Sequence, residues 1–207
     1  AAWLRAGVLD DSNAGRELAA LVRELAPELS EEVNAYLNAT DASARRFAVV
    51  FAALRYPGMR PYVDNGIGRT TPFARIDDYR DNWWCELAGF KGTVTAAERI
   101  GESLTDAPAI APPEFLSAAQ RDAAREELRR LSAYDTAPNF LTAEVLNYAA
   151  RRPADPRIPE ALHLCVKTTR YGCTNEATGE FSRRAFTLLH TRYKDSPWTA
   201  RTKLWFK

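Results

Sequence analysis

The sequence predicts an all-α protein built of stacked antiparallel helix pairs, an α-solenoid, and three observations carry this prediction. Apolar residues recur at spacings of three and four through nearly the whole chain. No segment alternates apolar and polar residues as a half-buried strand would. Short turns containing Pro or Gly separate helices of similar length. This repetition is typical of a solenoid, in which each unit buries its apolar stripe against its neighbours.

Composition limits the classes of function. The chain has 207 residues, of which 46% are hydrophobic and 27% charged, which is ordinary for a folded protein. Lys and Arg number 28 against 27 Asp and Glu, so the net charge of +1 gives no electrostatic reason to expect a nucleic acid partner. No stretch approaches the roughly 20 apolar residues of a membrane span. The first residues resemble no signal peptide and lack Met, as in a cleaved mature chain or a piece of a larger protein.

Residues 1–56 are predicted to form an N-terminal helical bundle. Three apolar stripes mark its helices: Leu18, Leu21, Val22 and Leu25; then Val33, Tyr36 and Leu37; then Phe47, Val50, Phe51 and Leu54. Residues that favour helix starts and stops separate these stripes: Ser12 or Asn13, Pro27, Ser30, Asp41 and Pro57. Ser30 is expected to cap the second helix.

Residues 57–113 are predicted to form a loop-rich segment with one Trp-containing helix. Pro, Gly and an Asn-Gly pair dominate its first part, which indicates turns. Binding residues are common on such irregular chain, so we expect part of it to contact a protein partner; the alternative is a turn region that covers the end of the bundle. The expected contact residues are Arg60, Tyr62, Arg69, Phe73, Trp83 and Trp84.

Residues 114–207 are predicted to form helical hairpins. Ser117 and Gln120 match a capping box at the start of the first helix. Pro138 and Pro159 open the next two helices. Ser196 is expected to cap a last helix that runs from Trp198 to Phe206, with Pro197 at its first position.

The stretch "AFTLLHTRYKDSPWTARTKLWF" resembles part of a tetratricopeptide-type repeat of exported bacterial proteins. The similarity covers about the last quarter of the chain, and Lys194 stands where such repeats usually have Pro. It implies stacked helical hairpins and names no ligand. The segments "RIDDYRDNWWC" and "RIPEALHLCVKTTRYGC" are also similar to C-terminal parts of large, uncharacterised, exported bacterial proteins. The repeat match is carried by Ala185, Leu188, Leu189, Tyr193, Ser196, Pro197 and Trp198.

The sequence has three cysteines, and whether they form a disulfide depends on the compartment of the protein. None belongs to a CxxC pair, so a structural zinc site is not expected. Cys165 falls on the apolar stripe of a predicted helix and is expected to be a buried thiol. If the chain is exported, a disulfide between Cys85 and Cys173 is expected; in a reducing compartment all three thiols would be free.

Few residues suggest catalysis. His163 and His190 each lie beside Leu in a predicted helix and are expected to be hydrogen-bonded structural imidazoles. Asp77 and Asp81, four residues apart on a helix, could hold a cation or share a proton, although neighbouring Arg residues also explain them as a surface ion-pair network. Glu102, followed by Ser, is similar to the catalytic dipeptide of lytic transglycosylases, but the downstream signature of that family is absent.

The sequence therefore favours a non-catalytic protein–protein interaction or assembly scaffold of the bacterial cell envelope, with no cofactor and no metal. Periplasmic or envelope-associated placement is expected, with a cytoplasmic location as the alternative. Trp198 and Trp205 are expected to join the contact residues of the loop-rich segment at the protein partner. The chain is expected to belong to a larger complex or protein, or to cap the end of a longer solenoid. The alternative function is an envelope enzyme that acts on glycan with Glu102 as its acid.

Overall fold

The computed structural model describes residues 1–57, 59, 61, 115–131, 133–171 and 174–205. Every regular element in these ranges is helical, which confirms the predicted all-α class. The elements are α1 Ala2–Val8, α2 Ser12–Leu25, the 3₁₀ turn η1 Pro27–Leu29, α3 Ser30–Leu37, α4 Ala42–Arg55, α5 Ala118–Leu131, α6 Ala137–Arg151, α7 Ile158–Tyr171, α8 Thr178–Arg192 and α9 Pro197–Arg201.

Two predicted helix starts differ from the structure. The cap of α2 is Asp11, whose Oδ1 accepts a hydrogen bond of 3.0 Å from the Ala14 amide, and not Ser12 or Asn13. Ser30 does not cap α3; its hydroxyl donates to the Pro27 carbonyl. The η1 turn explains this difference, because it brings Ser30 into the helical conformation, whereas a cap residue needs a non-helical backbone.

The caps predicted at Ser117, Gln120 and Ser196 are present, and Asp41 also caps a helix. The Ala44 amide donates to Asp41 Oδ1 at 2.9 Å at the start of α4. Ser117 and Gln120 form the reciprocal capping box, with bonds of 2.8 and 3.2 Å between each backbone amide and the other side chain. Ser196 caps α9, which ends at Arg201 and not at Phe206 as predicted, because the backbone of Thr202 is not helical (φ −104°, ψ 78°); the Thr202 carbonyl accepts a bond from the His190 side chain.

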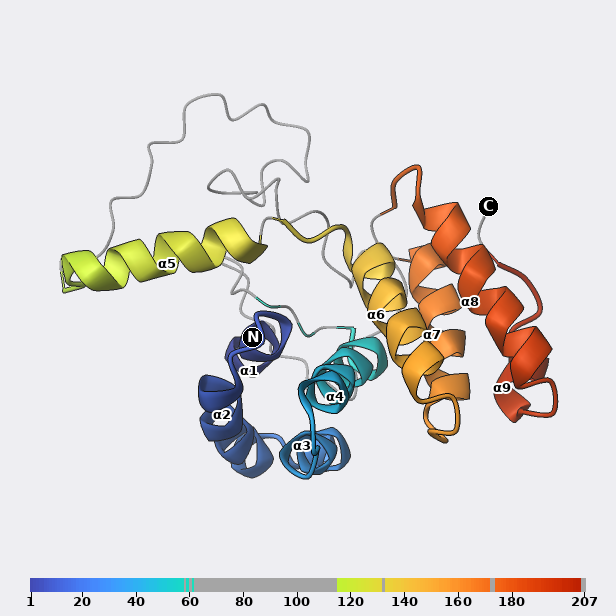
Figure 1. Ribbon diagram of the computed structural model, residues 1–207, viewed down its shortest axis with the longest axis horizontal. Helices are drawn as coiled ribbons and strands as arrows, with labels where there is room; N and C mark the ends of the chain where they lie inside the picture. Colours follow the sequence, from blue (N-terminus) through green and yellow to red (C-terminus); the bar gives the residue numbers. More distant parts are fainter. Residues whose placement is uncertain (58, 60, 62–114, 132, 172–173, 206–207) are drawn as a thin grey trace.

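The first four helices enclose a shared core (Figure 1). α1 contacts both α2 and α4, and α3 contacts both α2 and α4. The sequence pattern did not reveal α1, although it buries Trp3 and Leu4 completely or nearly so. The Trp3 ring meets the Tyr36 ring edge to face, with centroids 5.6 Å apart.

The helices α6, α7 and α8 form a group that packs against α4 through α6 and α7. α6 packs against α4 and α7, and α8 packs against both α6 and α7 (Figure 1). Phe47 of α4 is the main aromatic link, because its ring stacks on Tyr148 of α6 with centroids 3.9 Å apart and planes 3° apart. The buried apolar core therefore runs from α1 to α8 without interruption in the described residues.

Gly7 allows the close approach of α1 to α4. A Cβ atom at this position would lie 2.5 Å from Val49 Cγ2 and 2.9 Å from its Cγ1, and Val49 is fully buried. We expect Gly7→Ala to lower the free energy of unfolding by about 1–2 kcal/mol, because overpacking outweighs the helix propensity that Ala adds. Urea unfolding measures this loss.

A second substitution isolates the steric cause. Val49→Ala removes the two methyl groups that the added Cβ would meet. In that background Gly7→Ala should cost clearly less, because only the tight contact of 3.0 Å with the Cβ atom of residue 49 remains. An equal loss in both backgrounds would show that the contact with Val49 is not the reason for glycine at this position.

Candidate functional site

Most of the residues that the sequence indicated as functional lie outside the described ranges. Only Trp198 and Trp205 of the expected partner-binding set can be placed. The residues outside the described ranges are the other expected contact residues, the expected disulfide pair and the candidate catalytic carboxylates. They are Arg60, Tyr62, Arg69, Phe73, Trp83 and Trp84; Cys85 and Cys173; and Asp77, Asp81 and Glu102.

Trp198 and Trp205 lie along the same C-terminal segment. The Trp198 ring is 5.1 Å from the His163 ring of α7, and the guanidinium carbon of Arg201 lies 4.9 Å from its centroid. The Trp205 ring is 4.9 Å from the Phe186 ring of α8. The two Trp residues thus anchor the end of the described chain on two different helices.

Both histidines hold Thr202 in this segment. His163 Nδ1 is 2.7 Å from Thr202 Oγ1, and His190 Nε2 is 2.7 Å from the Thr202 carbonyl oxygen. The Thr202 hydroxyl already donates to the Trp198 carbonyl, so His163 Nδ1 must donate to it, and His190 Nε2 donates to the carbonyl. The prediction that both imidazoles are structural and hydrogen-bonded is confirmed.

The surroundings of His163 are electropositive. Its pKa is lowered, first because the ring is partly buried and second because Arg201 lies nearby. Glu160 acts in the opposite direction more weakly. The cations that act on the His163 imidazole are Arg201 and Arg170.

A pocket of about 470 Å³ opens between α7 and the residues that end and follow α9. Arg170 Nη2 donates to the Leu204 carbonyl, so the C-terminal segment forms a fixed wall of this pocket. None of the described residues that line it is acidic. The residues that line the pocket are His163, Val166, Lys167, Arg170, Arg201, Thr202, Lys203 and Leu204.

The pocket can therefore bind an anionic group beside an apolar one. Arg170, Arg201 and Lys203 are exposed at its edge, and the exposed fraction of Leu204 is 65%. Guanidinium groups present several N–H donors in a planar fork that matches a carboxylate. The sequence contains no contiguous basic stripe, and only the return of the chain along α7 brings these basic residues together.

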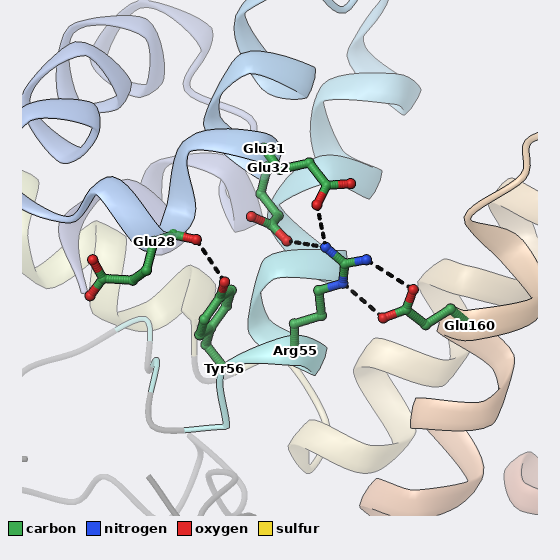
Figure 2. A network of polar contacts seen from close by, with 6 residues as sticks. All are labelled: Glu28, Glu31, Glu32, Arg55, Tyr56 and Glu160. Atoms are coloured by element: carbon green, nitrogen blue, oxygen red, sulfur yellow. Dashed lines mark hydrogen bonds and ion pairs between the residues drawn. The ribbon is translucent and has the colours of Figure 1, made fainter. Parts of the chain in front are cut away.

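A second ionic cluster joins α3, α4 and α7 around Arg55 (Figure 2). Arg55 Nε and Nη2 donate to the two carboxylate oxygens of Glu160 at 2.8 and 2.9 Å. Its Nη1 donates to Glu31 at 2.7 Å and to Glu32 at 2.9 Å. Because Arg55 pairs with all three carboxylates, we assign the cluster to stability and not to ligand binding, although the buried Oε2 of Glu32 accepts no hydrogen bond.

The charges in this cluster are unequally buried. Burial raises the pKa of Glu32, whose side chain is almost inaccessible, although its bond to Arg55 acts in the opposite direction. The bond to Glu160 is the main cause that raises the pKa of Arg55, which therefore stays charged. The two directions have different causes: loss of hydration raises the pKa of Glu32, whereas hydrogen bonds to carboxylates raise the pKa of Arg55.

Other reactive groups give no further site. Cys165 is fully buried, as predicted, and burial raises the pKa of its thiol to about 12, so it is a poor nucleophile. In the described residues, no group of three His, Cys, Asp or Glu side chains could hold a metal ion. None of the helices described here combines the length and apolar character that crossing a membrane requires.

The described residues form a helical structure with a cationic pocket lined by α7 and by residues 201–204. Comparison with known proteins finds no matching family model, no matching curated protein and no matching solved structure.

Proposed function

We propose that this protein is a non-catalytic protein–protein interaction or assembly module of the bacterial cell envelope. The observation that carries the proposal is the C-terminal surface, where the α7 pocket, the exposed Leu204 and the half-buried Trp198 adjoin one another. Aromatic and Arg side chains on a firmly held backbone are typical of residues that dominate protein interfaces.

The packing of the later helices supports the same proposal. α7 contacts both α6 and α8, and each of α6 and α7 also contacts the helix two places further along the chain, α8 and α9 respectively, as helices of a helical repeat do. In such proteins the stacked helices provide a rigid frame that presents residues to a partner. An α-solenoid of the tetratricopeptide type, part of a larger envelope protein, fits this packing and the resemblance of the last quarter of the chain.

Site-specific photo-crosslinking tests the proposal. A photoreactive phenylalanine analogue replaces Leu204 in the full chain, and the protein is irradiated in an extract of the organism that produces it. We expect one protein adduct, identified by mass spectrometry and suppressed by excess unmodified protein. The reason is that a partner seated on this surface must lie within reach of the side chain at 204.

Leu25 provides the matched control. It is also an exposed leucine, with an exposed fraction of 83%, but it lies at the end of α2 and away from α7 and α9 (Figure 1). The same analogue at Leu25 should not form that adduct. The absence of an adduct at 204, or identical adducts at both positions, would contradict an interaction role for the C-terminal surface.

A further inference from the structure

The pocket beside α7 has the charge and shape to recognise carboxylates presented by a peptide. We propose that it binds an acidic segment of the protein partner, with Arg201 and Lys203 as the main charged contacts and Arg170 in support. This inference rests on the proposed interaction function and specifies the chemistry of the partner.

Charge complementarity is the first argument. Three exposed cationic side chains, Arg170, Arg201 and Lys203, line one pocket with no carboxylate among its described lining residues. Glu160, the carboxylate that acts on the pKa of His163, has both of its oxygens bonded to Arg55. The overall net charge is only +1, so this local excess of positive charge is a property of the pocket and not of the whole chain.

The cations are partly fixed before any ligand binds. Arg201 lies over the Trp198 ring, and Arg170 is held by its bond to the Leu204 carbonyl. That bond uses one of the five N–H donors of a guanidinium group. Fixing long side chains in advance reduces the entropy that binding would otherwise cost.

The apolar lining distinguishes a peptide from a small inorganic anion. Val166 is buried at the pocket and Leu204 is exposed at its edge, so carbon atoms next to the carboxylates would also find contacts. Phosphate sites commonly use the free amides at a helix N-terminus. Here the described lining residues come from the middle and the last turns of α7 and from the residues that end and follow α9, so none of them is at a helix N-terminus.

Fluorescence anisotropy with the full chain tests this inference. The probe is a short fluorescein-labelled peptide rich in Glu with one central Leu, and the comparison probe has Gln at every Glu position. We expect the Glu peptide to bind more tightly than the Gln peptide. The double substitution Arg201→Gln with Lys203→Gln should weaken binding of the Glu peptide by about tenfold or more, because two charge-assisted contacts are lost.

The control removes the same two residue types elsewhere. Arg183→Gln with Lys194→Gln changes two exposed cations outside the pocket and lowers the net charge equally. Binding of the Glu peptide should change less than about twofold in this variant, as expected for weak long-range electrostatics. Circular dichroism establishes that both variants retain the helical fold.

Three outcomes would overturn the inference: equal binding of the Glu and Gln peptides, equal weakening by the two double variants, or binding of inorganic phosphate through Arg201 without binding of the Glu peptide. A crosslinked partner at Leu204 together with any of these results would leave the interaction function standing and refute only the acidic segment. Binding of the Glu peptide without a crosslinked partner would support the pocket chemistry and count against the interaction function.

Discussion

Arg55→Met should lower the free energy of unfolding by about 3–5 kcal/mol, because it leaves a buried carboxylate without its cation. Glu32 has a side-chain exposure of only 1%, and its Oε2 has no hydrogen-bond partner. Met keeps most of the aliphatic volume of Arg55, so the decrease in the free energy of unfolding measures the contribution of the charge and its hydrogen bonds. Chemical unfolding followed by circular dichroism measures it.

The geometry explains why a single cation has so large an effect. Arg55 connects α4 to α3 through Glu31 and Glu32, and to α7 through Glu160 (Figure 2). Its guanidinium carbon also lies 4.4 Å from the centroid of the Phe51 ring. Removing it therefore leaves three carboxylates close together and deletes the ion pairs that connect α4 to α3 and to α7.

Two variants separate this effect from the general loss of an ion pair. Arg183 pairs with Glu180 on the exposed surface of α8, so Arg183→Met should cost less than about 0.5 kcal/mol. Adding Glu32→Leu to Arg55→Met should restore part of the stability, since it removes the buried charge. If Arg55→Met costs no more than Arg183→Met, the Arg55 cluster contributes little to the fold.

Phe47→Ala should destabilise the protein by a similar amount, about 3–5 kcal/mol. The ring is 2% exposed and stacks on Tyr148 at 3.9 Å and on Phe51 at 5.8 Å between centroids. The Arg157 guanidinium carbon lies 4.9 Å from the same ring. Truncation would leave a cavity where α4 meets α6, together with the loss of the aromatic stacking. The measurement is again the free energy of unfolding.

Phe115 is the matched control for this substitution. Its exposed fraction is 85%, so Phe115→Ala should change stability by less than about 0.5 kcal/mol. Phe47→Leu should fall between the two, because it keeps much of the buried volume but loses the stacked ring. A Phe47→Ala loss below about 1 kcal/mol would show that the contact between α4 and α6 is not essential.

Most described helices could be predicted because their signals are local. The capping box of Ser117 and Gln120 and the Ser196 cap depend only on residues within one turn. α1 was missed because it is short and, unlike α9, has no capping side chain at its start. Leu25 was expected on the apolar stripe of its helix but is mostly exposed. The spacing of apolar residues identifies a stripe, but it does not show how much of that stripe another helix covers.

The candidate site could be predicted only in its separate parts. Trp198, Trp205 and the two histidines could be recognised from the sequence as aromatic or structural residues. Nothing in the spacing indicated that His163 and His190 would hold the same Thr202, or that Arg170 would bind the Leu204 carbonyl. These contacts join residues that lie 12 to 39 positions apart in the chain.

The sequence by itself determined the helical class and most helix boundaries, because apolar spacing, caps and Pro act over a few residues. Only the tertiary structure decided where charge accumulates. It placed Arg55 among three carboxylates and brought basic residues of α7 and of the C-terminal segment to one pocket. The physical reason is that electrostatic interactions depend on distance and burial in space, and both are set by how the helices pack.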